Sequence, residues 1–336
     1  MVTRRAFSVR RLSPRDKGAT AWRGYRGVVT TPHPDGDSWA DPAPPAPAPT
    51  PFARLVRVAR TGSTNADVAR ALLSAPDPDA ALRQWPHLSV LVTDHQAAGR
   101  GRAGRGWETP AGTSLTASVV LHPTAPVGRW SWLSLLGGLA VARAIEARTG
   151  LRAGLKWPND VLLLDADERS VPGWGRDRKV CGVLAEVVRP PASGMPGAGL
   201  RDRWSGVVVL GFGVNVHQEA SHLPVPWATS LAAAGAGRAE REMTALLVAV
   251  GDEISALVAA WDAADGDPVA SGLGAAVAAS CVTLGRDVRV LLPGGSEVAG
   301  RAVRLADDGA LAVRPAEGPE ALVAAGDVDH IRALTV

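Results

Sequence analysis

The chain has 336 residues, 46% hydrophobic and 21% charged, so it can bury a sizeable core, and its length favours two domains over one. Two cysteines, Cys181 and Cys281, exclude a disulfide scaffold and a cysteine-based zinc cluster, and a reducing cytoplasm is the simplest compartment. The longest uncharged small-residue stretch, residues 269–285, is too rich in Gly, Ala and Ser to favour a membrane span, and no secretory signal opens the chain.

Residues 1–51 are predicted to be a disordered tail that is first Arg-rich and then Pro-rich, because this composition buries too little surface to offset its ordering entropy. An organellar transit peptide is the alternative for such an acid-poor start. The tail is too short for a helix-turn-helix domain. Residues 1–30 carry a net +7, which leaves −4 for the remainder of a chain whose formal charge is +3.

The first predicted folded domain spans residues 52–278 and alternates strands with helices. Helical patterns are predicted over residues 63–73, 129–149 and 240–261, and Thr64 with Asp67 fits a capping box at the start of the first. Strands are predicted over residues 88–93, 114–121, 161–164, 180–188 and 206–216, and loops over residues 165–178 and 189–204. This order predicts an α/β fold in which helices cover a mixed β-sheet.

The second predicted domain, residues 279–336, differs in its pattern. Short alternating segments over residues 288–292, 297–305, 311–313 and 320–324 are joined by Pro-Gly-Gly and Asp-Asp-Gly turns. This pattern predicts a small all-β barrel.

The strongest chemical signal is the Gly/Arg segment from Gly99 to Trp107. Its glycines let a ligand approach the backbone, and Arg100, Arg102 and Arg105 provide permanently charged forks for phosphate or carboxylate oxygens. Trp107 adds a stacking face, so the segment predicts a nucleotide site. A nucleic-acid-binding RGG-like tail is the alternative, but this segment lies between two apolar strands of a folded domain.

A second signal is Lys156, which ends an apolar segment and precedes Trp-Pro-Asn-Asp. Only three of the 36 basic residues are lysines, which we interpret as a coding bias that replaces Lys with Arg wherever either suffices. A partly buried Lys156 would place a compact charge where an anion develops. A surface lysine in a turn capped by Asn159 and Asp160 is the alternative.

Three further segments are weaker when taken singly. Residues 179–186 form a strand in which Gly182 admits a ligand, and residues 211–216 end a strand with Gly-x-Gly and Asn215, or contain a bulge. Residues 61–65 suit a polar or anionic group at a helix start, or merely cap it. All three asparagines and two of the three lysines fall within these five segments, which independent accidents would not be expected to produce.

In their order and spacing, these motifs resemble those of the biotin–protein ligases. The resemblance covers about residues 55–330 and includes a C-terminal SH3-like barrel. The Gly-Arg-Gly-Arg segment together with Lys-Trp-Pro-Asn-Asp is highly specific, because related lipoate ligases share the fold but not usually that segment. Bifunctional members carry an N-terminal DNA-binding domain, whereas this chain has the Pro-rich tail and resembles the monofunctional class.

The resemblance implies a two-step reaction. The biotin carboxylate attacks the α-phosphorus of ATP to give biotinyl-5′-AMP and pyrophosphate, and a lysine of a carrier domain then displaces AMP. Lys156 and Arg102 are the implied catalytic residues, with Lys156 bridging the biotin carboxylate and the α-phosphate. Mg²⁺ is expected on the phosphates, although no metal ligand is assigned and the role of Asp160 stays open.

The resemblance also implies the binding residues. Biotin contacts are implied for Ser63, Thr64, Asn65, Gln96, Arg100, Gly101, Arg102, Gly112, Thr113, Ser114, Lys156 and Gly182. ATP contacts are implied for Arg100, Arg102, Arg105, Trp107, Asn159, Lys156 and Asn215, with Trp107 stacked on adenine.

The implied partner is a biotin carboxyl carrier protein or the carrier subunit of an acyl-CoA carboxylase, in the cytoplasm, with no nucleic acid or membrane partner. Two alternatives stay open. A lipoate ligase would form a different acyl adenylate on the same fold. A nucleic-acid-binding protein would bind DNA or RNA in a strongly salt-dependent way, which the net −4 beyond the tail disfavours.

Overall fold

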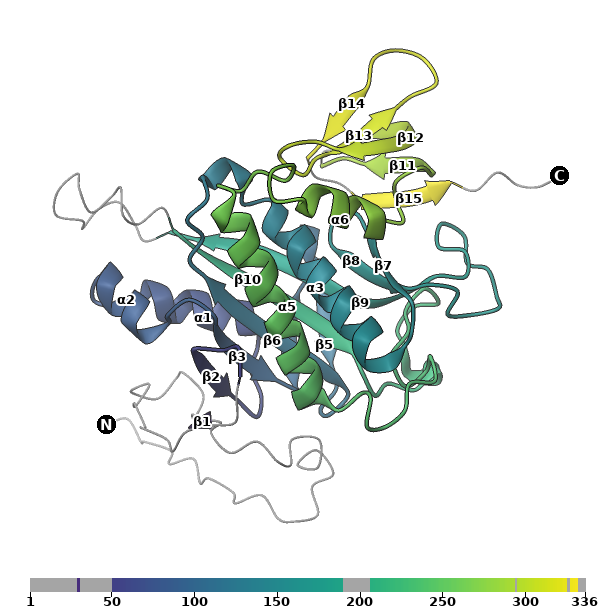
Figure 1. Ribbon diagram of the computed structural model, residues 1–336. Helices are drawn as coiled ribbons and strands as arrows, with labels where there is room; N and C mark the ends of the chain where they lie inside the picture. Colours follow the sequence, from purple (N-terminus) through teal and green to yellow (C-terminus); the bar gives the residue numbers. More distant parts are fainter. Residues whose placement is uncertain (1–28, 31–49, 190–205, 294, 325–326, 332–336) are drawn as a thin grey trace, which may run out of the picture.

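The computed structural model describes residues 29–30, 50–189, 206–293, 295–324 and 327–331 (Figure 1). The predicted tail lies almost entirely outside the described residues, and so does most of the predicted loop 189–204. Four of the tail's residues are described, 29–30 and 50–51, and Val29–Thr30 forms a short parallel strand, β1, against Val56 and Arg57. In this respect the tail departs from the expectation of no structure.

The larger of the two main sheets has the strand order β1-β2-β3-β6-β10-β9-β8-β7 among the described residues. Strands β1, β2 and β3 run parallel to one another, and every later pair in this order is antiparallel. The strands after β1 are β2 (Arg54–Arg57), β3 (Ser89–Thr93), β6 (Ser114–Leu121), β7 (Ala153–Lys156), β8 (Asp160–Leu163), β9 (Arg178–Val188) and β10 (Val207–Asn215). The predicted mixed sheet is therefore confirmed.

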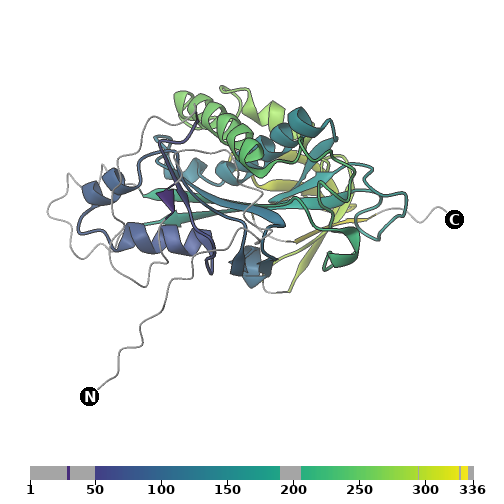
Figure 2. The ribbon, with the colours of Figure 1, turned by 90° about the horizontal axis from the view of Figure 1, so that it is seen from below.

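Helices cover both faces of this sheet (Figure 2). On one face lie α3 (Trp132–Thr149) and α5 (Met243–Ala263), whose apolar side chains join the main core. On the other face lie α1 (Thr64–Leu73) and α2 (Pro78–Gln84), which form a second core around Trp85. Both long helices start slightly later than predicted.

Local capping chemistry explains where helices α5 and α1 begin. Helix α5 begins after Glu242, whose carboxylate accepts hydrogen bonds from the N–H groups of Thr244 and Ala245 at 3.0 and 2.7 Å. Helix α1 is capped by Ser63, not by the predicted box of Thr64 and Asp67. The carboxylate of Asp67 instead accepts a hydrogen bond from the hydroxyl of Thr61.

The second main sheet is antiparallel, with the order β14-β13-β12-β11-β15, and agrees with the predicted SH3-like region. It contacts the first sheet's domain through indole groups: Trp132 Nε1 donates to Asp307 O at 2.8 Å, and Trp157 Nε1 donates to Gly309 O at 3.0 Å. Its strands are β11 (Asp287–Leu291), β12 (Glu297–Leu305), β13 (Leu311–Arg314), β14 (Ala321–Val323) and β15 (Asp327–Ile331).

Several elements lack a sequence prediction, among them strands β2, β7 and β15. The Gly/Arg segment forms a hairpin of β4 (Gln96–Arg100) and β5 (Gly106–Thr109), and α2 and α6 (Leu273–Ser280) are additional short helices. Among the described residues, α5 alone is long and apolar enough to cross a membrane. Its packing against α3 and the core accounts for that composition.

A pair of histidines on the α2 side of the sheet makes stability pH-dependent. The backbone N–H of His122 donates a hydrogen bond to the ring Nδ1 of His87 at 3.0 Å, which requires that Nδ1 carry no proton. Burial, followed by the neighbouring His87, lowers the pKa of His122 to about 4, and burial also lowers the pKa of His87. Below the usual histidine pKa of about 6.5 the unfolded chain therefore binds more protons than the folded one.

We expect the free energy of unfolding to decrease as the pH falls from about 6.5 towards about 4. Replacing the buried imidazole in His122→Gln should flatten this dependence, whereas His222→Gln, at an exposed position, should leave it unchanged. Urea denaturation at several pH values in this window measures the slopes. Equal slopes for the wild type and His122→Gln would contradict the assignment.

Candidate active site

The floor of the candidate site is the end of β10. Residues Val208, Leu210, Phe212 and Val214 belong to the core under α3 and α5, and side chains alternate along a strand. Gly211, Gly213 and Asn215 therefore face the opposite side, where they line a cavity of about 940 Å³. Because two of the three lack a side chain, the strand leaves room for a small molecule.

One end of the cavity is built from hydroxyl and amide groups at the start of α1. The N–H of Thr64 donates to Gln96 Oε1 at 2.9 Å, and Ser118 Oγ lies 2.7 Å from Thr64 Oγ1 and 2.5 Å from Asn65 Oδ1. Asn65 lies so close to Gly211 that a Cβ atom there would be 2.2 Å from Asn65 Oδ1. This end can satisfy both donors and acceptors of a polar ligand.

Glu186 connects this polar end to the Gly/Arg hairpin. Asn65 Nδ2 donates to Glu186 Oε2 at 2.8 Å, and Arg100 Nη2 lies 3.4 Å from Glu186 Oε1. The single carboxylate therefore fixes the orientation of the Asn65 amide and holds Arg100 beside the cavity.

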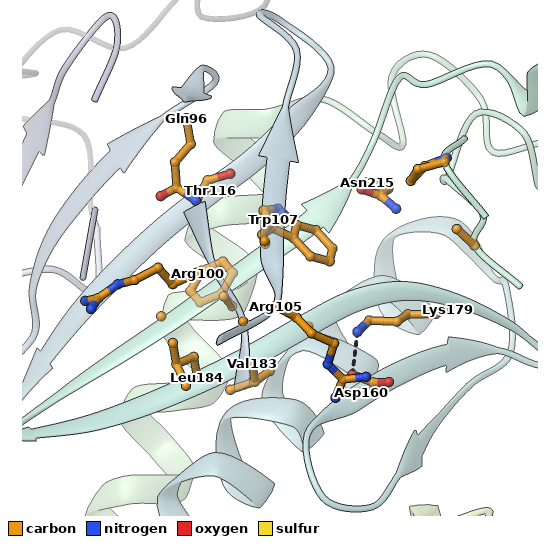
Figure 3. A pocket seen from close by; sticks show the side chains of 18 of the residues that line it. Gln96, Arg100, Arg105, Trp107, Thr116, Asp160, Lys179, Val183, Leu184 and Asn215 are labelled. Atoms are coloured by element: carbon orange, nitrogen blue, oxygen red, sulfur yellow. Dashed lines mark ion pairs between the residues drawn. The ribbon is translucent and has the colours of Figure 1, made fainter. Parts of the chain in front are cut away.

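The indole of Trp107 lies across the middle of the floor (Figure 3). A Cβ atom at Gly213 would be 2.6 Å from Trp107 Nε1, and one at Gly182 would be 3.5 Å from its ring. Any side chain at Gly213 would thus displace the indole, which explains the glycine there. Trp107 Nε1 is buried and has no hydrogen-bond partner among the described residues.

Positive charge gathers beyond Trp107. Lys179 Nζ lies 2.6 Å from Asp160 Oδ1 and 5.6 Å from the centre of the Trp107 ring (Figure 3). The lining contains Lys179 and three arginines but only two carboxylates, those of Asp160 and Glu219. This half of the cavity is therefore suited to anions.

The far end of the floor contains Gln218, which sequence reasoning missed because it belongs to no motif. Asn215 Nδ2 donates to Thr229 O at 3.0 Å, so its Oδ1 is left to accept from Gln218 Nε2 at 3.0 Å. The same Nε2 donates to Ser114 Oγ at 2.6 Å. Gln218 thus ties β10 to the start of β6.

Most of the residues proposed from sequence lie together around this cavity. Those that line it are Ser63, Thr64, Asn65, Gln96, Arg100, Gly101, Arg102, Arg105, Trp107, Thr113, Asn159, Gly182 and Asn215.

Three proposed residues, Gly112, Ser114 and Lys156, are absent from the lining. Lys156 is 5% exposed, and its Nζ lies 3.5 Å from the centre of the Trp174 ring. The lysine that lines the cavity is Lys179, from a segment in which sequence analysis assigned a ligand contact to Gly182 but no role to the lysine. The role of Lys156 as a bridge between two bound anions therefore stays a prediction from the motif.

Thiol chemistry has no part in this site. Burial raises the pKa of Cys181 to about 12 and also raises the pKa of Cys281, so both thiols stay protonated and unreactive near neutral pH. Among the described residues, no three His, Cys, Asp or Glu side chains gather to hold a metal ion.

Comparison with known proteins assigns the family. Residues 73–195 match the Biotin/lipoate A/B protein ligase family, and residues 283–331 match the Biotin protein ligase C terminal domain. The chain is 37% identical over 279 residues to the biotin–[acetyl-CoA-carboxylase] ligase of Mycobacterium tuberculosis, an alignment that covers 82% of this chain and 88% of that one. The chain belongs to the biotin protein ligase family. The resemblance drawn from the motifs is thereby confirmed.

Other family members agree with this assignment. The biotin–[acetyl-CoA-carboxylase] ligase of Paracoccus denitrificans is 34% identical over 164 residues, which cover 47% of this chain and 53% of that one. A solved biotin protein ligase of Aquifex aeolicus, in complex with biotin and ATP, is similar with a TM-score of 0.59 and 24% identity, over 84% of this chain and all of that one. At that identity the structural likeness supports the fold.

The close contact at Gly211 gives a testable consequence. In Gly211→Ala the added methyl group would overlap Asn65, so we expect the free energy of unfolding to fall by about 1–3 kcal/mol and hydrogen exchange at the start of α1 to increase. Gly128→Ala, where a Cβ atom meets no neighbour within 4 Å, is the matched control. If both variants match the wild type, Asn65 is not fixed against this strand.

Proposed function

We propose that this chain activates biotin with ATP and transfers it to a lysine of a carrier protein. The observation that supports the proposal is that different chemical groups line the two ends of one cavity. Hydroxyl and amide groups from Ser63 to Asn65 occupy one end, Lys179 lies beyond Trp107 at the other, and three arginines of the Gly/Arg hairpin line the cavity. The first end suits the ureido ring of biotin, and the second suits its carboxylate and the phosphates of ATP.

In the first half-reaction a biotin carboxylate oxygen forms a bond to the α-phosphorus of ATP, and pyrophosphate leaves. Coulomb repulsion opposes the approach of these two anions. We assign the stabilising cation at this point to Lys179, because its Nζ lies in the lining beside the Trp107 ring. Arg100, Arg102 and Arg105 add charge that is already in place before reaction.

Asp160 has a defined role in this scheme. Its carboxylate lies 2.6 Å from Lys179 Nζ, so it directs that ammonium group to one place. When the anions bind, Lys179 can shift its hydrogen bonds from Asp160 to them without crossing the cavity. Asp160 is in this view a positioning residue.

In the second half-reaction a neutral carrier lysine forms an amide bond to the biotinyl carbonyl carbon, and AMP leaves. Since relatives are named biotin–[acetyl-CoA-carboxylase] ligases, a carboxylase carrier domain is the natural acceptor. Adenine stacking on Trp107 and base or phosphate contacts from Asn159 and Asn215 belong to the same proposal, as does a cytoplasmic location.

Magnesium would enter with ATP as part of the substrate. An ion held mainly by phosphates needs only one or two carboxylates from the protein. Asp160 is the carboxylate of the lining that lies among the cations, so it is the residue that could contribute a ligand.

The proposed activity is tested by pyrophosphate exchange into ATP with biotin, lipoate or octanoate as the acid. We expect exchange with biotin alone, followed by labelling of a biotin carboxyl carrier domain. Exchange supported by lipoate instead would assign the chain to the related ligases. Salt-dependent nucleic-acid binding with no exchange would support the non-enzymatic alternative.

The role of Lys179 predicts a specific loss. Lys179→Ala should slow biotin-dependent exchange by about 10²–10³-fold, as removal of one donor to a developing anion does in other enzymes. The unfolding midpoint should change little, since the side chain is partly exposed. Arg83→Ala, which removes an exposed cation on α2, is the control. Near-wild-type exchange by Lys179→Ala would remove this lysine from the mechanism.

A further inference from the structure

Two buried side-chain amides meet where β10 ends. Asn215 Nδ2 donates to Thr229 O at 3.0 Å, and Gln218 Nε2 donates to Asn215 Oδ1 at 3.0 Å. The same Gln218 nitrogen donates to Ser114 Oγ at 2.6 Å, so both of its N–H groups are engaged. Asn215 and Gln218 are each 8% exposed and line the cavity, where Figure 3 shows Asn215. We call Asn215, Gln218 and Thr229 the amide cluster.

The orientation of both amides follows from Thr229. Its carbonyl oxygen can only accept a hydrogen bond, so the nitrogen of Asn215 faces it and the oxygen of Asn215 faces the nitrogen of Gln218. Gln218 Oε1 is left buried and without a partner in the part of the chain that the structure describes, which costs free energy. Reversing Gln218 would let Oε1 accept from the Ser114 hydroxyl, but it would set two amide oxygens against each other. The amide cluster therefore has one arrangement.

The segment that supplies the Thr229 carbonyl is itself held against the end of β10. The N–H of Leu231 donates to Asn215 O at 3.1 Å. The hydroxyl of Ser230, which is fully buried, donates to Gln218 O at 2.5 Å. These two hydrogen bonds flank the carbonyl in sequence, so Thr229 O stays directed at the Asn215 amide.

Two positions on the Asn215 amide remain for a ligand. Thr229 uses one of its two N–H groups and Gln218 uses one of its two oxygen lone pairs, and the contacts of the described residues leave one N–H and one lone pair. Asn215 lies two residues beyond Gly213, which is about 7 Å along the strand, and Gly213 is the residue against which Trp107 packs. A purine stacked on Trp107 can therefore place its edge at this amide.

We propose that the amide cluster selects adenine over other purines, with Gln218 as a positioning residue; this role rests on the proposed function, which places ATP beside Trp107. Adenine has an amino group next to a ring nitrogen that accepts, so its edge pairs with the oxygen and the N–H of one amide. A base with an oxygen in place of that amino group sets an acceptor where adenine has a donor. An amide free to rotate could meet that acceptor with its N–H, whereas an amide held by Gln218 and Thr229 meets it with its oxygen.

The effect of Gln218 should therefore appear in base selectivity and leave biotin binding unchanged. The groups proposed to bind the biotin ring lie at the start of α1, where they contact Gln96, Ser118 and Glu186. No hydrogen bond among the described residues joins that end of the cavity to the amide cluster. A role confined to folding would instead change ATP and ITP binding equally, because the two nucleotides differ only in the base.

The test is calorimetric titration with ATP and with ITP, whose base has an oxygen in place of the adenine amino group. We expect the wild-type enzyme to bind ATP about 10–100-fold more tightly than ITP. Gln218→Met keeps the length of the side chain but removes the donor to Asn215, and it should lower this ratio about 5-fold or more while the KM for biotin stays at the wild-type value. Gln84→Met, the same change on α2 and outside the cavity lining, should keep the wild-type ratio.

A wild-type enzyme that binds ATP and ITP equally well would overturn the selection of adenine, and a Gln218→Met enzyme with the wild-type ratio would overturn the role of Gln218. Should Gln218→Met fail to fold, Gln218→Glu replaces it, because it keeps the shape and sets a carboxylate oxygen against Asn215 Oδ1. A wild-type ratio in that variant would overturn the role equally. A wild-type enzyme that prefers ATP but shows no biotin-dependent exchange would instead contradict the proposed function, and the comparison of the two bases would still stand.

Discussion

Two anions have to meet in a cavity that is partly apolar, and this requires cations that are held in place before the anions arrive. The ion pair of Lys179 and Asp160 meets the requirement, because it joins two adjacent strands beside the cavity and holds a cation in its lining. Preorganised charge of this kind needs no rearrangement during reaction. In the same cavity, Glu186 pairs with Arg100 of the Gly/Arg hairpin and holds that cation beside the site.

Strand β10 both packs against the core and lines the cavity. In β10 one set of alternate residues fills the core under α3 and α5, while the other set changes from valine to glycine and then to Asn215 as the strand passes under the cavity. The valines at 207 and 209 support α1 and α2, and α1 in turn brings Asn65 against Gly211. The alternation of side chains along β10 therefore determines both the packing of the core and the space left for a ligand.

The mixed sheet, the second β domain and thirteen of the residues that line the cavity could be predicted from sequence, because each depends on local patterns. The sequence did not distinguish Lys156 from Lys179, since both end or begin apolar strands. The pairing of β7, β8 and β9 determines their surroundings. Lys156 Nζ lies over the Trp174 ring, whereas Lys179 Nζ forms an ion pair with Asp160. Neither Trp174 nor Gln218 belongs to a sequence motif. Their contacts, with Trp227 and Ser114, join segments that are distant in sequence. The capping box failed because Asp67 is engaged by Thr61.

The most direct test of the central claim is a crystal structure with a non-hydrolysable analogue of biotinyl-AMP. The account predicts that the analogue's ureido ring lies at Ser63, Thr64 and Asn65. Lys179 Nζ should lie within hydrogen-bond distance of the group that replaces the acyl phosphate. A structure in which Lys179 stays paired with Asp160 and away from the analogue would contradict the account.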